Sequence, residues 1–245
     1  MKRTESYFHP LVYWGLAVYM ILTFPVLSLG DKVVDFLIPE DHYFENVGAA
    51  SLFIASVLFF YCFFRSLRID AKGRVLWLKR LVYLGLALLF FFGAGEEISW
   101  GQRIFGFSTP VQLAQVNSQQ EFNIHNLDIF FRTNFFTVDR LFDIFWFLFA
   151  VTVPAVTLVR PELKGLATRL MPVVPRGLGA LFLWDYMLAK AAKTLFFAKY
   201  TYGPIEFVQA IQEIKESNYS ILFILAGLFS IWELRRSISG LSGEQ

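Results

Sequence analysis

Two adjacent carboxylates, Glu96 and Glu97, close a long apolar run that begins at Leu81 and reads into GAGEEISWGQR. A charged side chain at the centre of a bilayer costs roughly 2.5–3.5 kcal/mol even on translocon-insertion scales. A helix C-terminus also disfavours anions, because its free carbonyl groups carry partial negative charge. Carboxylates in such a place act as general bases, as metal ligands or as halves of buried ion pairs.

A second polar segment, QQEFNIHNLD, follows the pair. Its Glu121 and His125 are four residues apart, so a helix through both would project them from one face. Carboxylates and a histidine can bind a divalent ion or divide general acid and base roles. We therefore predict Glu96, Glu97, Glu121 and His125 as catalytic residues, with Glu97, Glu121 and His125 as ligands of a divalent metal ion. With only three His and no HExxH, a zinc site would rely mainly on oxygen ligands.

Other polar residues are candidates for binding a substrate. They are Asp41, Glu45, Gln102, Arg103, Asn123, Asn126, Asp185 and Lys190. Acidic residues also favour the first turn of a helix, which is the simpler interpretation of Asp41 and Glu45 and of Glu213 and Glu216 before the last apolar block. The simpler alternative for the Glu pair is a buried ion pair with Lys190, Lys193 or Arg103.

Apolar blocks must position these residues. The chain has 245 residues, of which 56% are hydrophobic and 17% charged, which exceeds the hydrophobicity of ordinary soluble domains. A spanning helix needs about 20 mostly apolar residues, and spanning backbone of this kind must be helical. The sequence predicts an all-α, polytopic integral membrane protein with about six transmembrane helices, at 10–29, 46–65, 77–97, 140–159, 177–198 and 217–235.

No repeat or low-complexity linker divides the chain, so residues 1–245 form one predicted transmembrane domain. The first block lacks a clear cleavage site and is interpreted as an uncleaved helix. Between the third and fourth spans, Ser108 and Pro110 indicate a helix start, and VQLAQVNSQQEF predicts a short interfacial helix within the segment 98–139. The single Cys62 cannot form an internal disulfide.

Basic residues indicate the orientation. If six spans alternate, the face that carries the N-terminus holds 14 of the 22 Lys and Arg. Short cytoplasmic loops carry an excess of Lys and Arg. Both termini are therefore predicted to be cytoplasmic, and the carboxylate-rich face, with segment 98–139, to lie outside. The expected partners are the lipid bilayer and a lipid or membrane-peptide substrate, with no nucleic acid; the oligomeric state stays open.

Two motifs resemble those of known proteins. GEEISWGQR and QQEFNIHN resemble segments of a group of uncharacterised bacterial multi-helix membrane proteins. The matching residues here are Asp41, Glu45, Glu96, Glu97, Gln102, Arg103, Asn117, Glu121, Asn123, His125 and Asn126. This resemblance covers about half of the chain and implies a location in the bacterial plasma (inner) membrane.

A more distant resemblance is to the CAAX-protease and bacteriocin-processing family of intramembrane glutamate proteases. That family has a Glu-Glu pair followed by Arg, which Glu96, Glu97 and Arg103 echo, although the Arg here lies two positions later. The family's later His motifs are absent from the membrane blocks. The resemblance implies a membrane-embedded peptidase.

Three functions follow from these observations. The first is a membrane-embedded hydrolase or transferase that acts on a lipid or membrane peptide from the outer face. The second is a small-solute or ion transporter, since intramembrane carboxylates also mark transport paths. The third is a non-catalytic scaffold or sensor, in which the charges only fix helix packing.

Overall fold

The computed structural model describes residues 8–29, 31–37, 42–69, 73–132, 137–197 and 204–242. These residues are helical apart from their connections and one antiparallel bridge between Asn117 and Leu127. The all-α class predicted from the sequence is therefore confirmed for the described part of the chain.

The helices follow one another in chain order. They are α1 (Pro10–Thr23), α2 (Asp31–Leu37), α3 (Tyr43–Leu67), α4 (Arg74–Glu97), α5 (Gln102–Phe105), α6 (Val111–Ala114), α7 (Asp128–Arg132), α8 (Val138–Trp146), α9 (Val153–Val159), α10 (Pro161–Leu170), α11 (Arg176–Leu195) and α12 (Pro204–Ser242). A π-helical stretch, Phe147–Thr152, joins α8 to α9 just before Pro154. In a regular α-helix the ring of this proline would clash with the preceding turn, and the proline has no N–H to donate.

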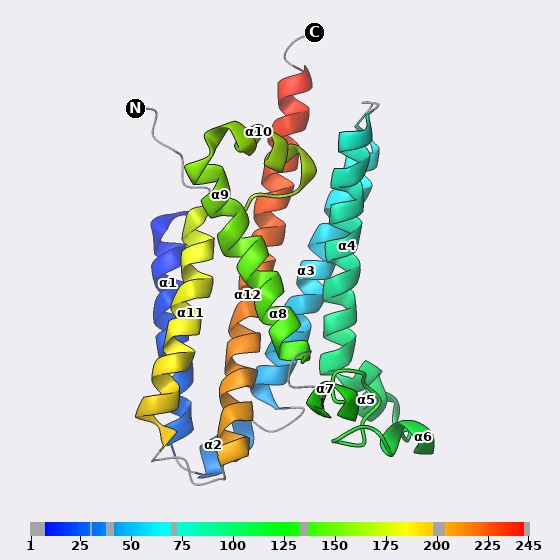
Figure 1. The fold of residues 1–245 in the computed structure, drawn as a ribbon, viewed down its shortest axis with the longest axis vertical. Coiled ribbons are helices and arrows are strands. Elements are labelled where there is room, and N and C mark those ends of the chain that lie inside the picture. The colour runs from blue at the N-terminus through cyan, green and yellow to red at the C-terminus, as the bar shows by residue number, and fades with distance from the viewer. Residues whose placement is uncertain are drawn as a thin grey trace.

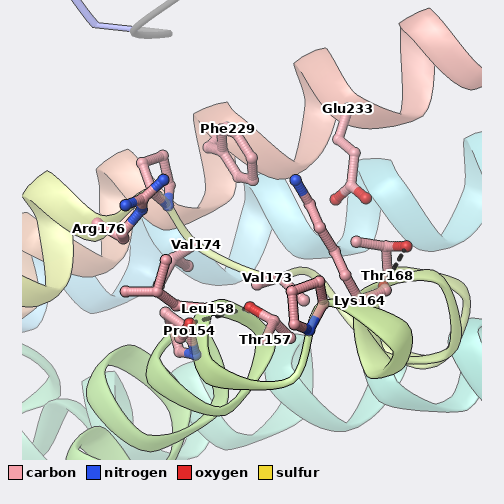
Figure 2. A pocket seen from close by; sticks show the side chains of 12 residues that line it. Pro154, Thr157, Leu158, Lys164, Thr168, Val173, Val174, Arg176, Phe229 and Glu233 are labelled. Carbon is pink, nitrogen blue, oxygen red and sulfur yellow. Dashed lines mark hydrogen bonds between the residues drawn. The ribbon is translucent and has the colours of Figure 1, made fainter. Parts of the chain in front are cut away.

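The long helices form a bundle (Figure 1). Helix α3 packs against α4 and α12, and α11 packs against α1 and α12. We call the end where α1 begins, α10 lies and α12 ends the upper end. At the lower end α4 ends, α12 begins, and α5, α6 and α7 form a compact cap (Figure 1). A cavity opens near the upper end, between α9, α10, α11 and α12 (Figure 2).

Among the described residues, five helical stretches are long and apolar enough to cross a membrane. They are Pro10–Ser28, Tyr43–Leu67, Arg74–Glu97, Arg140–Val159 and Phe207–Arg236. The predicted span 177–198 corresponds to α11, which runs along the bundle beside α1 but is not one of the five, because Asp185, Lys190 and Lys193 interrupt its apolar sequence. The count of six spans is thus not confirmed by composition.

The predicted helix that continues from Ser108 through Glu121 is wrong. Only Val111–Ala114 is helical there, and Gln120 has a φ of 59°. The cause lies in Asn117, whose Oδ1 accepts the backbone N–H groups of Gln119 at 3.0 Å and Glu121 at 3.2 Å. An Asn side chain that satisfies nearby backbone donors competes with the helix for them.

Aromatic side chains fill the core between the long helices. The Phe223 ring of α12 lies 4.6 Å from that of Phe90 in α4 and 5.2 Å from that of Phe182 in α11, centroid to centroid. Helix α11 also approaches the π-helical stretch so closely that a Cβ on Gly179 would lie 2.3 Å from the carbonyl oxygen of Ala150. These contacts fix the helices whose lower ends carry the predicted site.

Candidate functional site

Helix α4 ends in a left-handed turn that follows directly after its two carboxylates. Ser99, Trp100 and Gly101 have φ values of 45°, 53° and 78°. The turn folds the Trp100 indole back over Gly95, where a Cβ would lie 2.9 Å from the ring. Its Nε1 donates to Glu96 Oε1 at 2.6 Å. Two non-glycine residues in this region cost on the order of 1–3 kcal/mol each, which the surrounding contacts must offset.

Glu96 is a structural anchor for the loop that follows. Its Oε2 accepts the backbone N–H groups of Ile124 at 2.6 Å and His125 at 2.8 Å, and the His125 ring Nδ1 lies 3.4 Å away. The residue is only 5% exposed. Because both oxygens are engaged in these bonds and in the Trp100 bond, Glu96 is poorly placed to act as a free general base.

Glu121 is held in a second network inside the same cap. It accepts hydrogen bonds from Ser99 Oγ at 2.7 Å and Asn123 Nδ2 at 2.9 Å, and it forms an ion pair with Arg103. Asn123 Oδ1 in turn accepts from Asn117 Nδ2 at 2.8 Å. The carboxylate of Glu121, a predicted metal ligand, thus binds one guanidinium and two neutral donors. Arg103, a predicted substrate-binding residue, is paired with this carboxylate.

Two further predicted binding residues also close the cap. Gln102 Oε1 accepts the backbone N–H of Phe122 at 2.7 Å, and its Nε2 donates to Thr109 Oγ1 at 2.9 Å. Asn126 donates to the side chain of Gln119. The segments GEEISWGQR and QQEFNIHN therefore build one folded unit. Asp41 lies outside the described residues.

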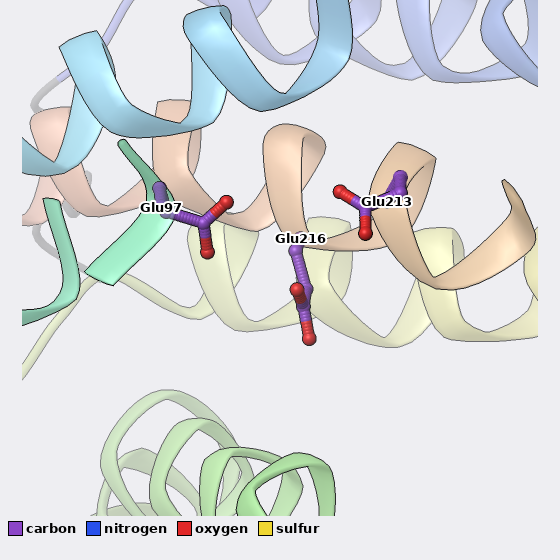
Figure 3. Close-up of side chains that lie close together, drawn as sticks. All are labelled: Glu97, Glu213 and Glu216. Atoms are coloured by element: carbon purple, nitrogen blue, oxygen red, sulfur yellow. The ribbon is translucent and has the colours of Figure 1, made fainter. Parts of the chain in front are cut away.

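Glu97 faces the other way, into the bundle. Figure 3 shows it at the end of α4, across from Glu213 and Glu216 of α12. One ligand oxygen from each of these three residues lies within 4.8 Å of the others. Gly48 of α3 brings backbone close to this cluster, since a Cβ there would lie 3.8 Å from Glu97 Oε2 and 3.7 Å from the Cα of Ser217. We call Glu97, Glu213 and Glu216 the carboxylate cluster.

Sequence reasoning missed two members of the cluster because it placed the last helix wrongly. The span predicted at 217–235 left Glu213 and Glu216 at a helix start, where the helix dipole accounts for acidic residues. Helix α12 instead begins at Pro204, so both residues lie more than two turns inside it. The sequence did contain one indication of the cluster. Glu213 and Glu216 are three residues apart, a spacing that places two carboxylates on one face of a helix.

The imidazole of His125 lies near enough to the carboxylate cluster to be affected by the charge of Glu216. Burial alone would lower the pKa of its imidazole, but the hydrogen bond with Glu96 and the charges of Glu216, Glu96 and Glu45 outweigh burial and raise that pKa above its usual value. Its side chain is 33% exposed. An imidazole whose protonated form is favoured can supply a proton to a group bound nearby.

Asp185 belongs to a different polar node, deep among α1, α11 and α12. It is 0% exposed, and its Oδ1 accepts from Asn218 Nδ2 at 2.7 Å. The same Nδ2 group donates to Thr23 Oγ1 at 3.1 Å. Asp185 Oδ2 and Asn218 Oδ1 are buried without a hydrogen-bond partner among the described residues.

Lys190 does not join either group. It is exposed on α11, and its Nζ lies 5.1 Å from the centroid of the Tyr186 ring. The alternative of an ion pair between the Glu96–Glu97 pair and Arg103 is not realised, because Arg103 pairs with Glu121.

Comparisons of the chain with protein-family models, curated proteins and solved structures gave no match.

The cluster's donor set has a defined chemistry. Carboxylate oxygens suit hard divalent cations such as Mg²⁺, Mn²⁺ and Ca²⁺. Ca²⁺ binds oxygens at about 2.3–2.6 Å, so two oxygens on opposite sides of one ion lie up to about 5 Å apart. The separations within the cluster fit that range. Two carboxylates 4 Å apart repel by about 4 kcal/mol at an effective dielectric constant of about 20, and a cation between them would offset this cost.

Proposed function

We propose that the chain is a membrane-embedded hydrolase or transferase whose active site is the carboxylate cluster with His125. The observation that carries this proposal is the approach of Glu97, Glu213 and Glu216, from two different helices, to within 4.8 Å. One of them is half of the Glu-Glu pair that the sequence singles out. The other half, Glu96, supports the site by holding the His125 segment against the end of α4.

In this proposal Glu97, Glu213 and Glu216 would hold a divalent cation. Such a cation would polarise a carbonyl or phosphoryl oxygen and lower the pKa of water. Glu97 would serve as a ligand or as the base that receives a water proton, and His125 would supply a proton to the leaving group. Ser217 adds support, because its Oγ is buried without a partner among the described residues, next in sequence to Glu216. A bound water or substrate atom would satisfy that hydroxyl.

The surroundings suggest a lipid or membrane-peptide substrate. The described part of the chain has five helices apolar enough to sit in a bilayer, and the cluster lies toward their lower end. Ile104 and Phe105, in the neighbouring cap, are 72% and 78% exposed. Large apolar side chains in this position favour contact with the headgroup layer. With the bias of basic residues, the cluster would open to the extracytoplasmic side of a bacterial plasma membrane, with both termini cytoplasmic.

Metal analysis of the purified protein tests the proposal directly. Wild type should retain a divalent metal through gel filtration, and Glu97→Gln and Glu216→Gln should each lose it, because the amide ligates metal poorly. Glu162→Gln, at an exposed position of α10, is the matched control and should retain it. Loss in Glu121→Gln would favour the ligand set Glu97, Glu121 and His125. A metal-free wild type, with these variants unchanged in stability, would contradict the enzyme proposal.

A transporter is the second candidate, because Asp185 is fully buried near the middle of α11. Buried carboxylates in membrane helices mark ion and proton paths. If the protein is a transporter, transport into proteoliposomes should be lost in Asp185→Asn and retained in Glu97→Gln. If it is an enzyme, catalytic activity should be lost in Glu97→Gln and retained in Asp185→Asn. If neither variant changes any activity but both change melting temperature, the scaffold or sensor alternative is favoured.

A further inference from the structure

The cavity near the upper end is separate from the carboxylate cluster. Its volume is about 400 Å³, within the range of roughly 300–1,000 Å³ that is typical of ligand sites. Its walls come from α9, the length of α10, the start of α11, the linker between these two helices, and the upper part of α12 (Figure 2). No part of the proposed reaction uses it.

Two cationic side chains line this cavity, Lys164 of α10 and Arg176 of α11. Neither forms an ion pair within the part of the chain that the structure describes. The one acidic residue in the lining, Glu233, is engaged by Lys79, with 3.6 Å between Nζ and Oε1. Because Lys79 offsets much of the charge of Glu233, the lining keeps a net positive charge from Lys164 and Arg176. Such a pair suits an anion with several acceptor oxygens, and a phosphate is the common case.

The neutral hydroxyls in the lining are already satisfied. Thr157 Oγ1 donates to the carbonyl of Pro154 at 2.9 Å, and Thr168 Oγ1 donates to that of Lys164 at 2.9 Å. The polar recognition in this cavity thus falls to its charged side chains, which are the two cations and Glu233. This leaves charge, rather than a specific hydrogen-bond pattern, as the main selector of the ligand.

The rest of the wall is apolar. Leu158, Val173, Val174 and Phe229 face the cavity beside the two cations. The outer surface is apolar too, since Val159 is 74% exposed and Leu163 and Leu166 of α10 are 41% and 52% exposed. A short helix with basic residues and exposed leucines is suited to the headgroup layer of a bilayer. A ligand that matches both features has a phosphate next to hydrocarbon.

We propose that this cavity binds the phosphate group of one phospholipid, between Lys164 and Arg176, with the glycerol and upper acyl chains against Leu158 and Phe229. Basic pockets between membrane helices bind anionic headgroups in this way. The bound lipid would join α10 to α11 and α12, and so hold the upper end of the bundle together.

Binding of defined probes to the delipidated full-length protein in detergent tests the proposal. Native mass spectrometry and thermal melts would follow short-chain phosphatidylglycerol, short-chain diacylglycerol and inorganic phosphate. Phosphatidylglycerol should bind with a stoichiometry of one and raise the melting temperature. Diacylglycerol, which lacks phosphate, and inorganic phosphate, which lacks hydrocarbon, should each bind at least tenfold more weakly.

Variants then locate the site. Lys164→Gln and Arg176→Gln should each weaken phosphatidylglycerol binding roughly tenfold, since a hydrogen bond to a charged group is lost. Lys164→Arg keeps the charge and should bind as wild type does, which also controls for folding. Arg169→Gln, on α10 but outside the lining, is the matched control and should have no effect. Equal binding of diacylglycerol, saturation by inorganic phosphate alone, or an equal loss in Arg169→Gln would each overturn the proposal.

Discussion

The Oε2 atom of Glu96 accepts the backbone N–H of His125 at 2.8 Å, so one carboxylate joins a helix end to a loop 29 residues later. Its neighbour Glu97 points into the bundle, toward two glutamates of α12 (Figure 3). The Glu-Glu pair therefore divides into an anchor and a candidate reactive group. This division leads to opposite expectations for the two residues.

Removing the anchor should destabilise the protein. In Glu96→Ala the backbone N–H groups of Ile124 and His125 and the Trp100 indole lose their acceptor. We expect a loss of about 2–4 kcal/mol, because buried donors are left unsatisfied. Glu97→Gln should unfold no more easily than wild type once metal has been removed by a chelator. Thermal melts of both variants in detergent measure the difference, and equal destabilisation would contradict the division of roles.

The Trp100 contact gives a second prediction. Gly95→Ala would place a methyl group 2.9 Å from the indole, so the ring must move and its bond to Glu96 must weaken. Overpacking of this kind costs roughly 1–3 kcal/mol. Gly85→Ala in the same helix is the control, because nothing lies within 4 Å of a Cβ there. Denaturation of both variants should separate them; equal stability would show that the indole moves freely.

The raised pKa of His125 predicts a pH-dependent stability. Because the folded-state pKa exceeds the unfolded value of about 6.5, the contribution is fully present below about pH 6.5. It is lost as the pH rises through the folded-state pKa. The difference in melting temperature between wild type and His125→Gln should therefore shrink on going from about pH 6 to about pH 9. A constant difference over that interval would show that His125 does not gain a proton-dependent partner on folding.

Cysteine labelling tests the proposed orientation. In a Cys62→Ala background, Gln115→Cys places a thiol on the lower cap and Gly165→Cys places one on α10. Both positions are exposed. An impermeant thiol reagent should label Gln115→Cys in intact cells and Gly165→Cys only after lysis. The reverse pattern would place the carboxylate cluster on the cytoplasmic side.

The sequence was sufficient to predict the helical class and most of the membrane helices, because their signal is local. Blocks of apolar residues lie where Tyr43–Leu67 and Arg74–Glu97 are found, within about a turn of the predicted bounds. The beginning of α12 was missed because Gln209, Gln212 and Glu213 interrupt the apolar sequence of its first turns. In the structure α12 packs against α3 and α11. A helix face that packs against protein can carry polar residues, whereas a face that contacts lipid cannot do so without a large cost in free energy.

The site was predicted less completely, for a physical reason. The left-handed turn at Ser99 and Trp100 determines which partners the glutamate oxygens contact. Such a turn has no reliable sequence signal outside glycine. A regular helix through Glu121 and His125 would have put them together. In the structure they face different partners, Arg103 and Glu96, and the residues that meet Glu97 come from another helix.

The node around Asp185 gives the last prediction. This residue is 0% exposed and accepts a hydrogen bond from Asn218 of another helix. Asp185 Oδ2 and Asn218 Oδ1 are both acceptors without a donor among the described residues. If the Asp185 carboxyl group carries a proton, it can donate a hydrogen bond, as an amide does. If it is ionised, it remains a buried charge whose hydrogen bonds are only partly satisfied.

Asp185→Asn therefore mimics the protonated acid and should fold as stably as wild type or more so. Asp185→Leu removes the acceptor of Asn218 Nδ2 and should cost about 1–3 kcal/mol, since a buried amide is left partly unsatisfied. Asn218→Leu in the Asp185→Leu background should recover much of that loss, because replacing both partners removes the unsatisfied groups. Thermal melts of wild type, Asp185→Leu, Asn218→Leu and the double variant form a double-mutant cycle. A strongly destabilised Asp185→Asn would show that the carboxylate is ionised in the folded protein and paired with a cation.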